Sequence, residues 1–243
     1  MPNPTAAMLV IGDEILSGRT RDANMYYLAG QLAPRGIDLC EVRIVTDQHD
    51  RIVGALNALR ADHDHVFTSG GIGPTHDDIT ADAVAAAFGV GLDIRDDARA
   101  ILAEHYARTG LELNAARLRM ARIPDGASLI DNPVSSAPGF SIGNVHVMAG
   151  VPAVFQAMVA ALLPSLAAGA ALYSQNLTIP RGEGEIAADL KALAEAFPDL
   201  SIGCYPFQRD GAFGASVVVR GADRAQVDAA LIKLAALFPE AVA

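Results

Sequence analysis

A glycine-rich loop between an apolar run and a helical pattern constrains the fold of this chain more than any other feature. Residues 68–80 read Thr-Ser-Gly-Gly-Ile-Gly-Pro-Thr-His-Asp-Asp-Ile-Thr, after the apolar residues 66–67 and before the helical pattern of residues 81–88. Glycines permit positive φ angles and a close approach of the backbone to a ligand. Free N–H groups at the start of a helix suit a phosphate. The segment therefore predicts a strand, a phosphate-binding loop and a helix in succession.

Two adjacent carboxylates, Asp77 and Asp78, follow the glycines. Carboxylates repel a bare phosphate, so a bridging divalent cation would reconcile the two groups. Hard oxygen ligands suit Mg²⁺, with substrate phosphates completing its shell. A plainer interpretation is a glycine turn before an acidic helix start, which the helix dipole favours by itself. Spacing alone leaves these two interpretations equally open, and a Walker A loop is excluded because no Gly-Lys-Ser/Thr follows.

Strand and helix patterns alternate over the first 169 residues, which predicts an α/β sandwich with a mostly parallel sheet. The expected strands are residues 6–11, 37–45, 66–69, 127–130 and 142–148, and the expected helices are residues 22–36, 50–59, 80–89, 96–108, 114–121 and 153–168. Pro164 is expected to kink the last of these helices. Ligands bind at the carboxyl ends of the strands in such sheets. Asp13, Asp47 and the loop at Gly70 all fall at that edge.

The pattern changes after residue 169. A strand, a helix, two strands and a final helix are expected at residues 174–179, 185–197, 201–205, 216–219 and 226–238. This βαββα unit is self-contained, so we expect two domains, residues 1–169 and 170–243.

Composition and charge exclude several classes of protein. Half of the chain is apolar, its net charge is −10 and its pI is about 4.9. Nucleic-acid binding needs clustered Lys and Arg, so we expect none. The start of the sequence lacks a signal-peptide pattern. The uncharged residues 132–180 are broken by prolines and glycines before they reach the ~20 residues of a membrane span. We therefore expect a cytoplasmic protein with no membrane contact, in which Cys40 and Cys204 are buried, reduced thiols.

Further acidic and polar residues follow the first two strands. Asp13 and Glu14 lie directly after the first strand, where two acids are costly unless they are solvated or given a cation. Asp47 follows the second strand and is expected beside Asp78, although a single acid there is more often a turn residue. Asp22 is equally well explained as a helix cap, and Asn24 beside it also reads as a capping residue.

Two later loops could complete the site. Residues 132–140 form a polar, proline-rich loop whose Ser135 and Ser136 could donate to a ligand, although a surface turn explains this segment better on its own. Gly150 lies in another strand-to-helix turn, which resembles an anion site but is also expected on structural grounds. His76 could contact a phosphate or transfer a proton, although a single loop histidine is more often just exposed.

Taken in order, these segments resemble one family. Gly-Asp-Glu-Ile-Leu with Asp22 and Asn24, Gly-Gly-Ile-Gly-Pro-Thr-His-Asp-Asp-Ile-Thr, Ser-Ser-Ala-Pro-Gly-Phe and Gly-Val-Pro look like the molybdopterin-binding-like domain of the CinA (competence/damage-inducible) family. The glycine loop and Gly203-Cys-Tyr-Pro206 are especially similar to the corresponding region of eukaryotic FAD synthase. The resemblance covers nearly the whole chain. It implies a three-layer α/β/α fold related to molybdenum-cofactor biosynthesis proteins, followed by a small KH-like domain.

The resemblance also implies an activity, the metal-dependent cleavage of ADP-ribose, FAD or a related dinucleotide to AMP and a phosphorylated product. Asp78, Asp47 and Asp13 would hold Mg²⁺, Mn²⁺ or Co²⁺, with K⁺ as a further candidate ion. Asp78, Asp77 and His76 would be the catalytic residues. The expected substrate-binding residues are Gly12, Asn24, Ser69, Gly70, Gly71, Gly73, Thr75, Ser135, Ser136, Gly139 and Gly150.

Two other functions stay open, and both use the same loops. One is a pterin-handling, adenylyltransferase-like protein of molybdenum-cofactor metabolism, and the other is a non-catalytic nucleotide sensor. The expected ligand is thus a small-molecule nucleotide or pterin. A homo-oligomer is also expected, because such assemblies are common in the family and residues 145–172 are apolar. Neither nicotinamide-mononucleotide deamidation nor FAD synthesis is expected, because the domains that catalyse them in the relatives have no counterpart in these 243 residues.

Overall fold

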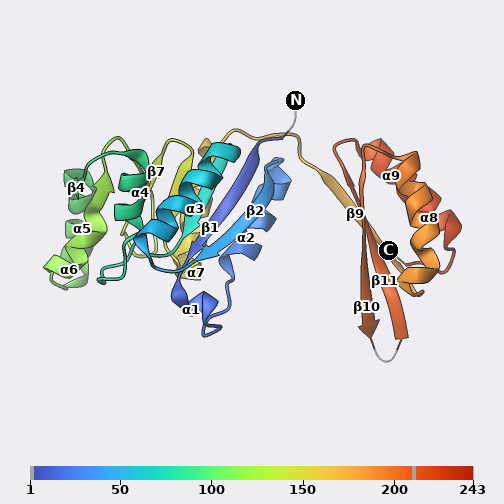
Figure 1. The fold of residues 1–243 in the computed structure, drawn as a ribbon, viewed down its shortest axis with the longest axis horizontal. Helices are drawn as coiled ribbons and strands as arrows, with labels where there is room; N and C mark the ends of the chain where they lie inside the picture. The colour runs from blue at the N-terminus through green and yellow to red at the C-terminus, as the bar shows by residue number, and fades with distance from the viewer. Residues whose placement is uncertain (1–2, 210–211, 243) are drawn as a thin grey trace. The chain divides into compact units, whose positions relative to one another are not determined.

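The structure is a computed structural model that describes residues 3–209 and 212–242. The chain forms two compact units, Met1–Gly169 and Ala170–Ala243 (Figure 1). The first unit is built on a six-stranded sheet in the order β2-β1-β3-β8-β7-β6. Its strands are β1 (Thr5–Ile11), β2 (Asp38–Val45), β3 (His65–Ser69), β6 (Ser128–Ile130), β7 (Gly139–Ile142) and β8 (Val145–Met148).

The sheet is mostly parallel, as predicted. β1 pairs in parallel with β2 and β3, and β3 with β8, whereas β7 and β6 run antiparallel at one end. Helices cover both faces, which confirms the three-layer fold (Figure 1). The helices α2 (Asn24–Leu32) and α7 (Pro152–Leu162) pack on one face, and α3 (His49–Asp62) and α4 (Thr80–Phe88) pack on the other.

The central strand β1 shows why its sequence is apolar throughout. Ala6, Met8 and Val10 enter the core below α2 and α7, and the alternate residues Ala7, Leu9 and Ile11 enter the core below α3 and α4. Strands buried on both faces have no polar alternation. The carboxyl end of β1 leads into α1 (Asp13–Leu16), a short helix where the sequence predicts a loop.

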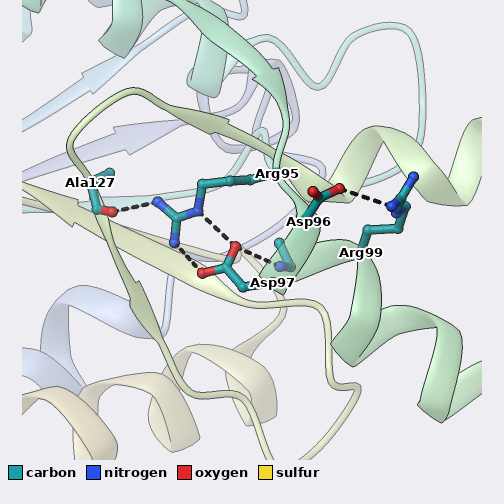
Figure 2. Close-up of polar contacts among 6 residues, drawn as sticks. Arg95, Asp96, Asp97, Arg99 and Ala127 are labelled. Atoms are coloured by element: carbon teal, nitrogen blue, oxygen red, sulfur yellow. Dashed lines mark hydrogen bonds and ion pairs between the residues drawn. The ribbon is translucent and has the colours of Figure 1, made fainter.

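A side structure next to α4 contains α5 (Asp96–Thr109), α6 (Ala115–Leu118) and an antiparallel pair that the sequence analysis missed, β4 (Leu92–Ile94) and β5 (Arg122–Pro124). Arg95 anchors the start of α5. Its guanidinium donates to both carboxylate oxygens of Asp97 at 2.7 and 2.8 Å and to the carbonyl of Ala127 at 2.5 Å (Figure 2). Figure 2 also shows Asp96 paired with Arg99 one helical turn further on. These contacts tie the helix to the loop before β6.

Three predictions about this unit are wrong in detail. The expected single strand at residues 142–148 is a hairpin, since Gly143, with a φ of 54°, turns the chain between β7 and β8. Gly139 consequently lies in β7 rather than in a loop. The expected helix at residues 153–168 ends at Leu162, and Pro164 lies in the 3₁₀ turn Leu163–Ser165 that follows.

The second unit has the predicted βαββα order. It contains β9 (Tyr173–Ile179), α8 (Glu183–Ala196), β10 (Ser201–Arg209), β11 (Ala212–Gly221) and α9 (Arg224–Leu237). Its antiparallel sheet has the order β10-β11-β9 and packs one face against both helices through clusters that include Ile179, Ile186 and Leu234.

Two further predictions concern cysteines and membranes. Cys204 is half-buried, but Cys40 is exposed on β2, so the expectation that both thiols are buried is wrong for Cys40. Among the described residues, no helix is both long enough and apolar enough to cross a bilayer.

Candidate functional site

A pocket of about 550 Å³ opens at the carboxyl ends of β1, β2, β3 and β8. This is the edge of the sheet at which the sequence predicts the ligand. The pocket walls come from the loops that leave these strands and from the loop before β7. The lining residues expected from the sequence are Gly12, Asp47, Gly70, Gly71, Gly73, Asp77, Asp78, Ser135 and Gly150.

The glycine loop after β3 has a backbone that only glycine accommodates. Gly70 and Gly71 have φ angles of 110° and 68°, and a Cβ on Gly70 would collide with the carbonyl oxygen of Ile11. Thr80 fastens the loop to α4, because its hydroxyl donates to the Gly70 carbonyl at 2.9 Å and its N–H donates to the Gly71 carbonyl at 3.0 Å. No described residue accepts a hydrogen bond from the N–H groups of Gly71, Ile72 and Gly73. These donors remain available to a ligand.

Asn24 supports this loop from outside the pocket. Its amide donates to the Ser69 hydroxyl and to the Gly150 carbonyl, both at 2.7 Å. A Cβ on Gly150 would lie 3.2 Å from the Cα of Gly70, so the two strand-to-helix turns touch. Asn24 and Ser69 are buried and lie outside the main pocket, beside a smaller one of about 60 Å³. The structure therefore gives both residues a supporting position, while Gly150 reaches the pocket wall.

The pocket also carries acidic side chains. Glu14, Asp47, Asp77 and Asp78 line it, and Asp47 accepts a 2.8 Å hydrogen bond from the backbone N–H of Asp13. Burial raises the pKa of Asp47. The backbone hydrogen bond opposes this rise in pKa, and the charges of Asp13, Glu14 and Asp77 increase it. Asp13 thus contributes its N–H to the wall, and the carboxylate that reaches the pocket from this turn belongs to Glu14.

Thr75 orients the acids at the end of the glycine loop. Asp78 Oδ2 accepts from the Thr75 N–H at 2.8 Å and from the Thr75 hydroxyl at 2.6 Å. The same hydroxyl lowers the pKa of Asp77. Thr75 and His76 do not line the pocket. The His76 side chain is 99% exposed, with its Nδ1 3.9 Å from Asp77 Oδ1.

Asn132 organises the polar loop before β7. It is buried, donates to the Ser135 hydroxyl and the Ala137 carbonyl at 2.7 and 2.8 Å, and accepts from two backbone N–H groups of its own loop. Ser135 lines the pocket as a result. Ser136, with a φ of 61°, turns away and pairs with His105 Nδ1 at 2.9 Å. Gly139 lies in the sheet, where a Cβ would collide with the carbonyl of Val147.

Sequence reasoning omitted several residues of this pocket from the site. Glu14, Thr20, Met120, Asn132 and Val151 are among the lining residues. Glu14 and Asn132 carried a usable signal. Glu14 was named with Asp13 as an acid that needs solvent or a cation, and Asn132 begins the polar loop of residues 132–140. Arg119 carried no such signal in the sequence. It lies beside Asp78 in a neighbouring pocket of about 20 Å³, and its buried Nε has no partner among the described residues.

Comparison with known proteins identifies the family. The sequence model of one family, described as "Probable molybdopterin binding domain", matches residues 7–168. The chain belongs to this family. Residues 171–243 match a second description, "FAD synthase, middle domain". The molybdopterin-binding-like unit also resembles the solved structure of the protein CinA from Thermoplasma acidophilum, with a TM-score of 0.62 and 33% identity over 68% of this chain and 99% of that chain. That relative is itself described as a protein with unknown function.

Similar sequences include proteins of several lengths. A protein of Caldivirga maquilingensis is 34% identical over 73% of this chain and 70% of its own length. A CinA-like protein of Shewanella sediminis is 32% identical over 76% of this chain and 46% of its own length. A CinA-like protein of Geobacter metallireducens is 42% identical over 55% of this chain and 32% of its own length. The chain therefore spans less than half of either CinA-like protein.

The acids of the molybdopterin-binding-like unit fit a divalent cation that a ligand helps to hold. No three Asp, Glu, His or Cys side chains within residues 3–209 and 212–242 converge into a ready metal site. Mg²⁺ is commonly bound by one or two carboxylates together with substrate phosphates, so a complete protein cage is not required. The pocket offers oxygen donors from Asp47 and Asp78. Burial, and to a lesser extent the charges of Asp13, Glu14 and Asp77, raise the pKa of Asp47, and this crowding of negative charge favours a cation there.

Proposed function

We propose that this chain is a metal-dependent nucleotide pyrophosphatase that hydrolyses ADP-ribose, FAD or a related dinucleotide to AMP and a phosphorylated product. The observation that carries the proposal is the meeting of opposite ligand preferences in one pocket. The unpaired N–H groups of the glycine loop suit phosphate oxygens, and the carboxylates of Asp47 and Asp78 in the same pocket suit a cation. A pyrophosphate with a bound divalent ion satisfies both.

The proposed roles follow from the positions of the residues. The N–H groups of Gly71 to Gly73 donate to one phosphate and hold it against the mouth of β3. Asp78, fixed by Thr75, and Asp47, fixed by the N–H of Asp13, hold the cation. When bound, that cation neutralises the pyrophosphate and lowers the pKa of the attacking water.

The attacking water must lose a proton, so the reaction needs a base. Water adds to one phosphorus, the bond from that phosphorus to the bridging oxygen breaks, and the bridging oxygen leaves with the other phosphate. Asp77 lines the pocket and is the base that we propose for the proton of the water. Thr75 lowers the pKa of its carboxyl, which keeps the group ionised but makes it a weaker base. His76 is next to Asp77 and points into solvent, so it would pass the proton on rather than take it first.

The family match supports a second candidate function. A probable molybdopterin-binding domain is expected to take a pterin, and a pocket of about 550 Å³ is in the usual range for a ligand of that size. In this case the same glycine loop would hold the phosphate of a pterin, in an adenylyltransferase-like role. A nucleotide sensor without turnover would use the loop in the same way.

The test is to incubate the purified chain with ADP-ribose or FAD, with and without Mg²⁺, Mn²⁺ or Co²⁺, and to measure AMP release. We expect metal-dependent AMP release that is lost in Asp78→Ala and kept in Asp125→Ala, which removes an exposed acid outside the pocket. Exchanging K⁺ for Na⁺ at constant ionic strength tests whether AMP release also depends on K⁺. The absence of AMP with every metal, or full activity in Asp78→Ala, would reject the pyrophosphatase. Ligand-induced stabilisation without turnover would then support pterin or nucleotide binding.

A further inference from the structure

Arg119 carries a charge that the described chain leaves unbalanced. It begins the 3₁₀ turn Arg119–Ala121, which follows α6, and its Nε atom is buried with no hydrogen-bond partner among the described residues. Its Nη2 atom donates to the carbonyl oxygen of Asp78 at a long 3.4 Å. No carboxylate within residues 3–209 and 212–242 forms an ion pair with it. A partly buried guanidinium without a counter-charge is unfavourable unless an anion is supplied.

The position of Arg119 connects it with the proposed phosphate site. Together with Gly71, Ile72 and Gly73 it lines the neighbouring pocket of about 20 Å³, and the same three residues line the main pocket and carry its available N–H groups. A cavity of that size holds about one water molecule. Such a water would accept the Nε–H, but it would not balance the charge.

Two other arginines border neighbouring pockets, and neither offers the same combination. Arg122 borders the same small pocket as Arg119, but its two Nη atoms donate to the Asp82 carboxylate at 3.0 and 2.6 Å, so its charge is already balanced. Arg21 is exposed and borders the pocket beside Asn24, which contains none of residues 71–73. Of these three arginines, Arg119 is the one whose charge is both unbalanced and next to the glycine loop.

The main pocket needs a positive charge to hold a phosphate. Its described lining residues include four acids and no lysine, arginine or histidine. The acids repel phosphate oxygens until a cation is bound. Arg119 lies among apolar residues of the small pocket that include Ile123 and Phe140. Apolar surroundings screen a charge weakly, so the guanidinium can offset this repulsion from beside the loop.

We infer that Arg119 is a positioning residue whose charge lets the glycine loop hold a phosphate before a divalent cation arrives. The inference rests on the proposed function, because it concerns the same phosphate site. The N–H groups of residues 71–73 make the contacts with the phosphate, and the arginine charge favours an anion there. The class of ligand follows, since the site recognises a nucleotide through its phosphate. A nucleoside monophosphate should therefore bind without metal, and more tightly than its nucleoside.

Binding in the absence of metal tests this inference separately from turnover. Isothermal titration calorimetry in excess EDTA compares AMP with adenosine, which differ only in the phosphate. The parent chain should bind AMP at least about 10-fold more tightly than adenosine. Arg119→Met keeps an unbranched side chain without the charge, and it should bring the two affinities to within about threefold of each other. Arg119→Lys should keep most of the preference, because the role requires a charge rather than the guanidinium fork.

Two controls separate this role from a structural one. Arg117→Met removes the same charge from an arginine that lies over the Tyr106 ring, outside both pockets, and it should leave the preference for AMP unchanged. Thermal unfolding without ligand is the second control. Because an unbalanced charge costs stability, Arg119→Met should have the same Tm as the parent chain or a higher one. Loss of a structural contact would instead lower the Tm and weaken the binding of both ligands equally.

The result is distinguishable from that of the AMP-release assay. If the chain releases AMP from ADP-ribose but Arg119→Met keeps the parent preference for AMP, the inference is overturned and the pyrophosphatase stands. A preference that is lost in Arg119→Met and kept in Arg119→Lys supports the inference even if no AMP is released. A parent chain that does not bind AMP in EDTA, or an equal weakening of AMP and adenosine in Arg119→Met, would overturn it.

Discussion

The Oδ2 atom of Asp47 accepts a 2.8 Å hydrogen bond from the backbone N–H of Asp13, which joins the carboxyl ends of β2 and β1 at the acidic wall of the pocket. The bond fixes the direction of the Asp47 carboxylate. Burial raises the pKa of this carboxyl, and the charges of Asp13, Glu14 and Asp77 raise it further. The pocket thus concentrates negative charge that a bound cation would relieve, and the fold without a cation carries the resulting repulsion.

Asp47→Asn is expected to separate stability from cation binding. Asparagine keeps an oxygen for the Asp13 N–H but removes the charge. Because the pKa of Asp47 is raised in the folded state, the ionised group opposes folding near pH 7, and the variant should melt at the same temperature or up to about 3 °C higher without metal. The gain in Tm on adding Mg²⁺ or Mn²⁺ should be lost. A lower Tm with an unchanged response to metal would contradict this role.

Gly70→Ala should be far more costly than Gly18→Ala. Both glycines have positive φ angles, 110° and 71°, but a Cβ at Gly18 meets no atom within 4 Å whereas one at Gly70 would collide with the Ile11 carbonyl. We expect a loss of about 1 kcal/mol for Gly18→Ala from backbone strain alone and about 3 kcal/mol or more for Gly70→Ala. Urea unfolding followed by circular dichroism measures both, and equal losses would show that the collision is relieved elsewhere.

The hydroxyl of Thr75 is expected to matter for turnover through Asp78. Thr75→Val keeps the shape of the side chain and the backbone hydrogen bond to Asp78 Oδ2 but removes the 2.6 Å bond from the hydroxyl, so the carboxylate is held by one bond in place of two. Metal-dependent AMP release should fall about 10-fold, with the larger effect on the metal concentration needed for half-maximal rate. Thr75→Ser keeps the hydroxyl and should retain most of the activity. If the two variants behave alike, the hydroxyl is not what positions Asp78.

His146 should make the first unit sensitive to acid. It is 5% exposed, hydrogen-bonded to Ser141 at 2.9 Å, and burial, with a smaller effect of His65, lowers its pKa from 6.5 to about 4. Between these values the unfolded chain binds a proton that the folded chain does not, so stability falls as the pH drops from 6.5 toward 4, by about 3 kcal/mol in all.

The matched variant is His146→Gln. Urea unfolding at pH 7, 5.5 and 4.5 should show a shallower loss of stability than in the parent chain, and the difference between the two curves isolates this histidine. His49→Gln, an exposed histidine at the start of α3, should leave the loss in place. An identical pH dependence in parent and His146→Gln would mean that other groups cause the acid sensitivity.

Much of the fold follows from local patterns. Strands buried on both faces are continuous apolar runs, and the helices between them start and stop near recognisable residues. Asp22, for example, lies two residues before α2 begins at Asn24 and accepts from the Met25 N–H at 3.0 Å. The hairpin β7–β8 was missed although the sequence carries its signal, since Gly143-Asn144 between two short apolar runs is a typical two-residue hairpin turn. Hydrogen bonds to residues distant in sequence fix the turn in place. The Asn144 amide donates to the carbonyls of Arg60 and His63 at the end of α3.

The loops around the pocket were predictable, but the direction of neighbouring side chains was not. Asp13 and Glu14 are adjacent acids, yet only Glu14 reaches the pocket, because the chain enters α1 between strand and loop. Ser135 and Ser136 divide in the same way, since Ser136 pairs with His105 on a helix 31 residues earlier. The exposure of Cys40 depended on strand order, which places β2 at the edge of the sheet.

Each of the four apolar clusters draws its members from one unit, two clusters from residues 1–169 and two from residues 170–243. The two family matches meet at the same place, ending at residue 168 and beginning at residue 171. The two units can therefore be inherited separately. A recombination event near residue 170 would transplant a whole hydrophobic interior with either piece, so new pairings of these modules could arise by gene fusion without redesign of a core.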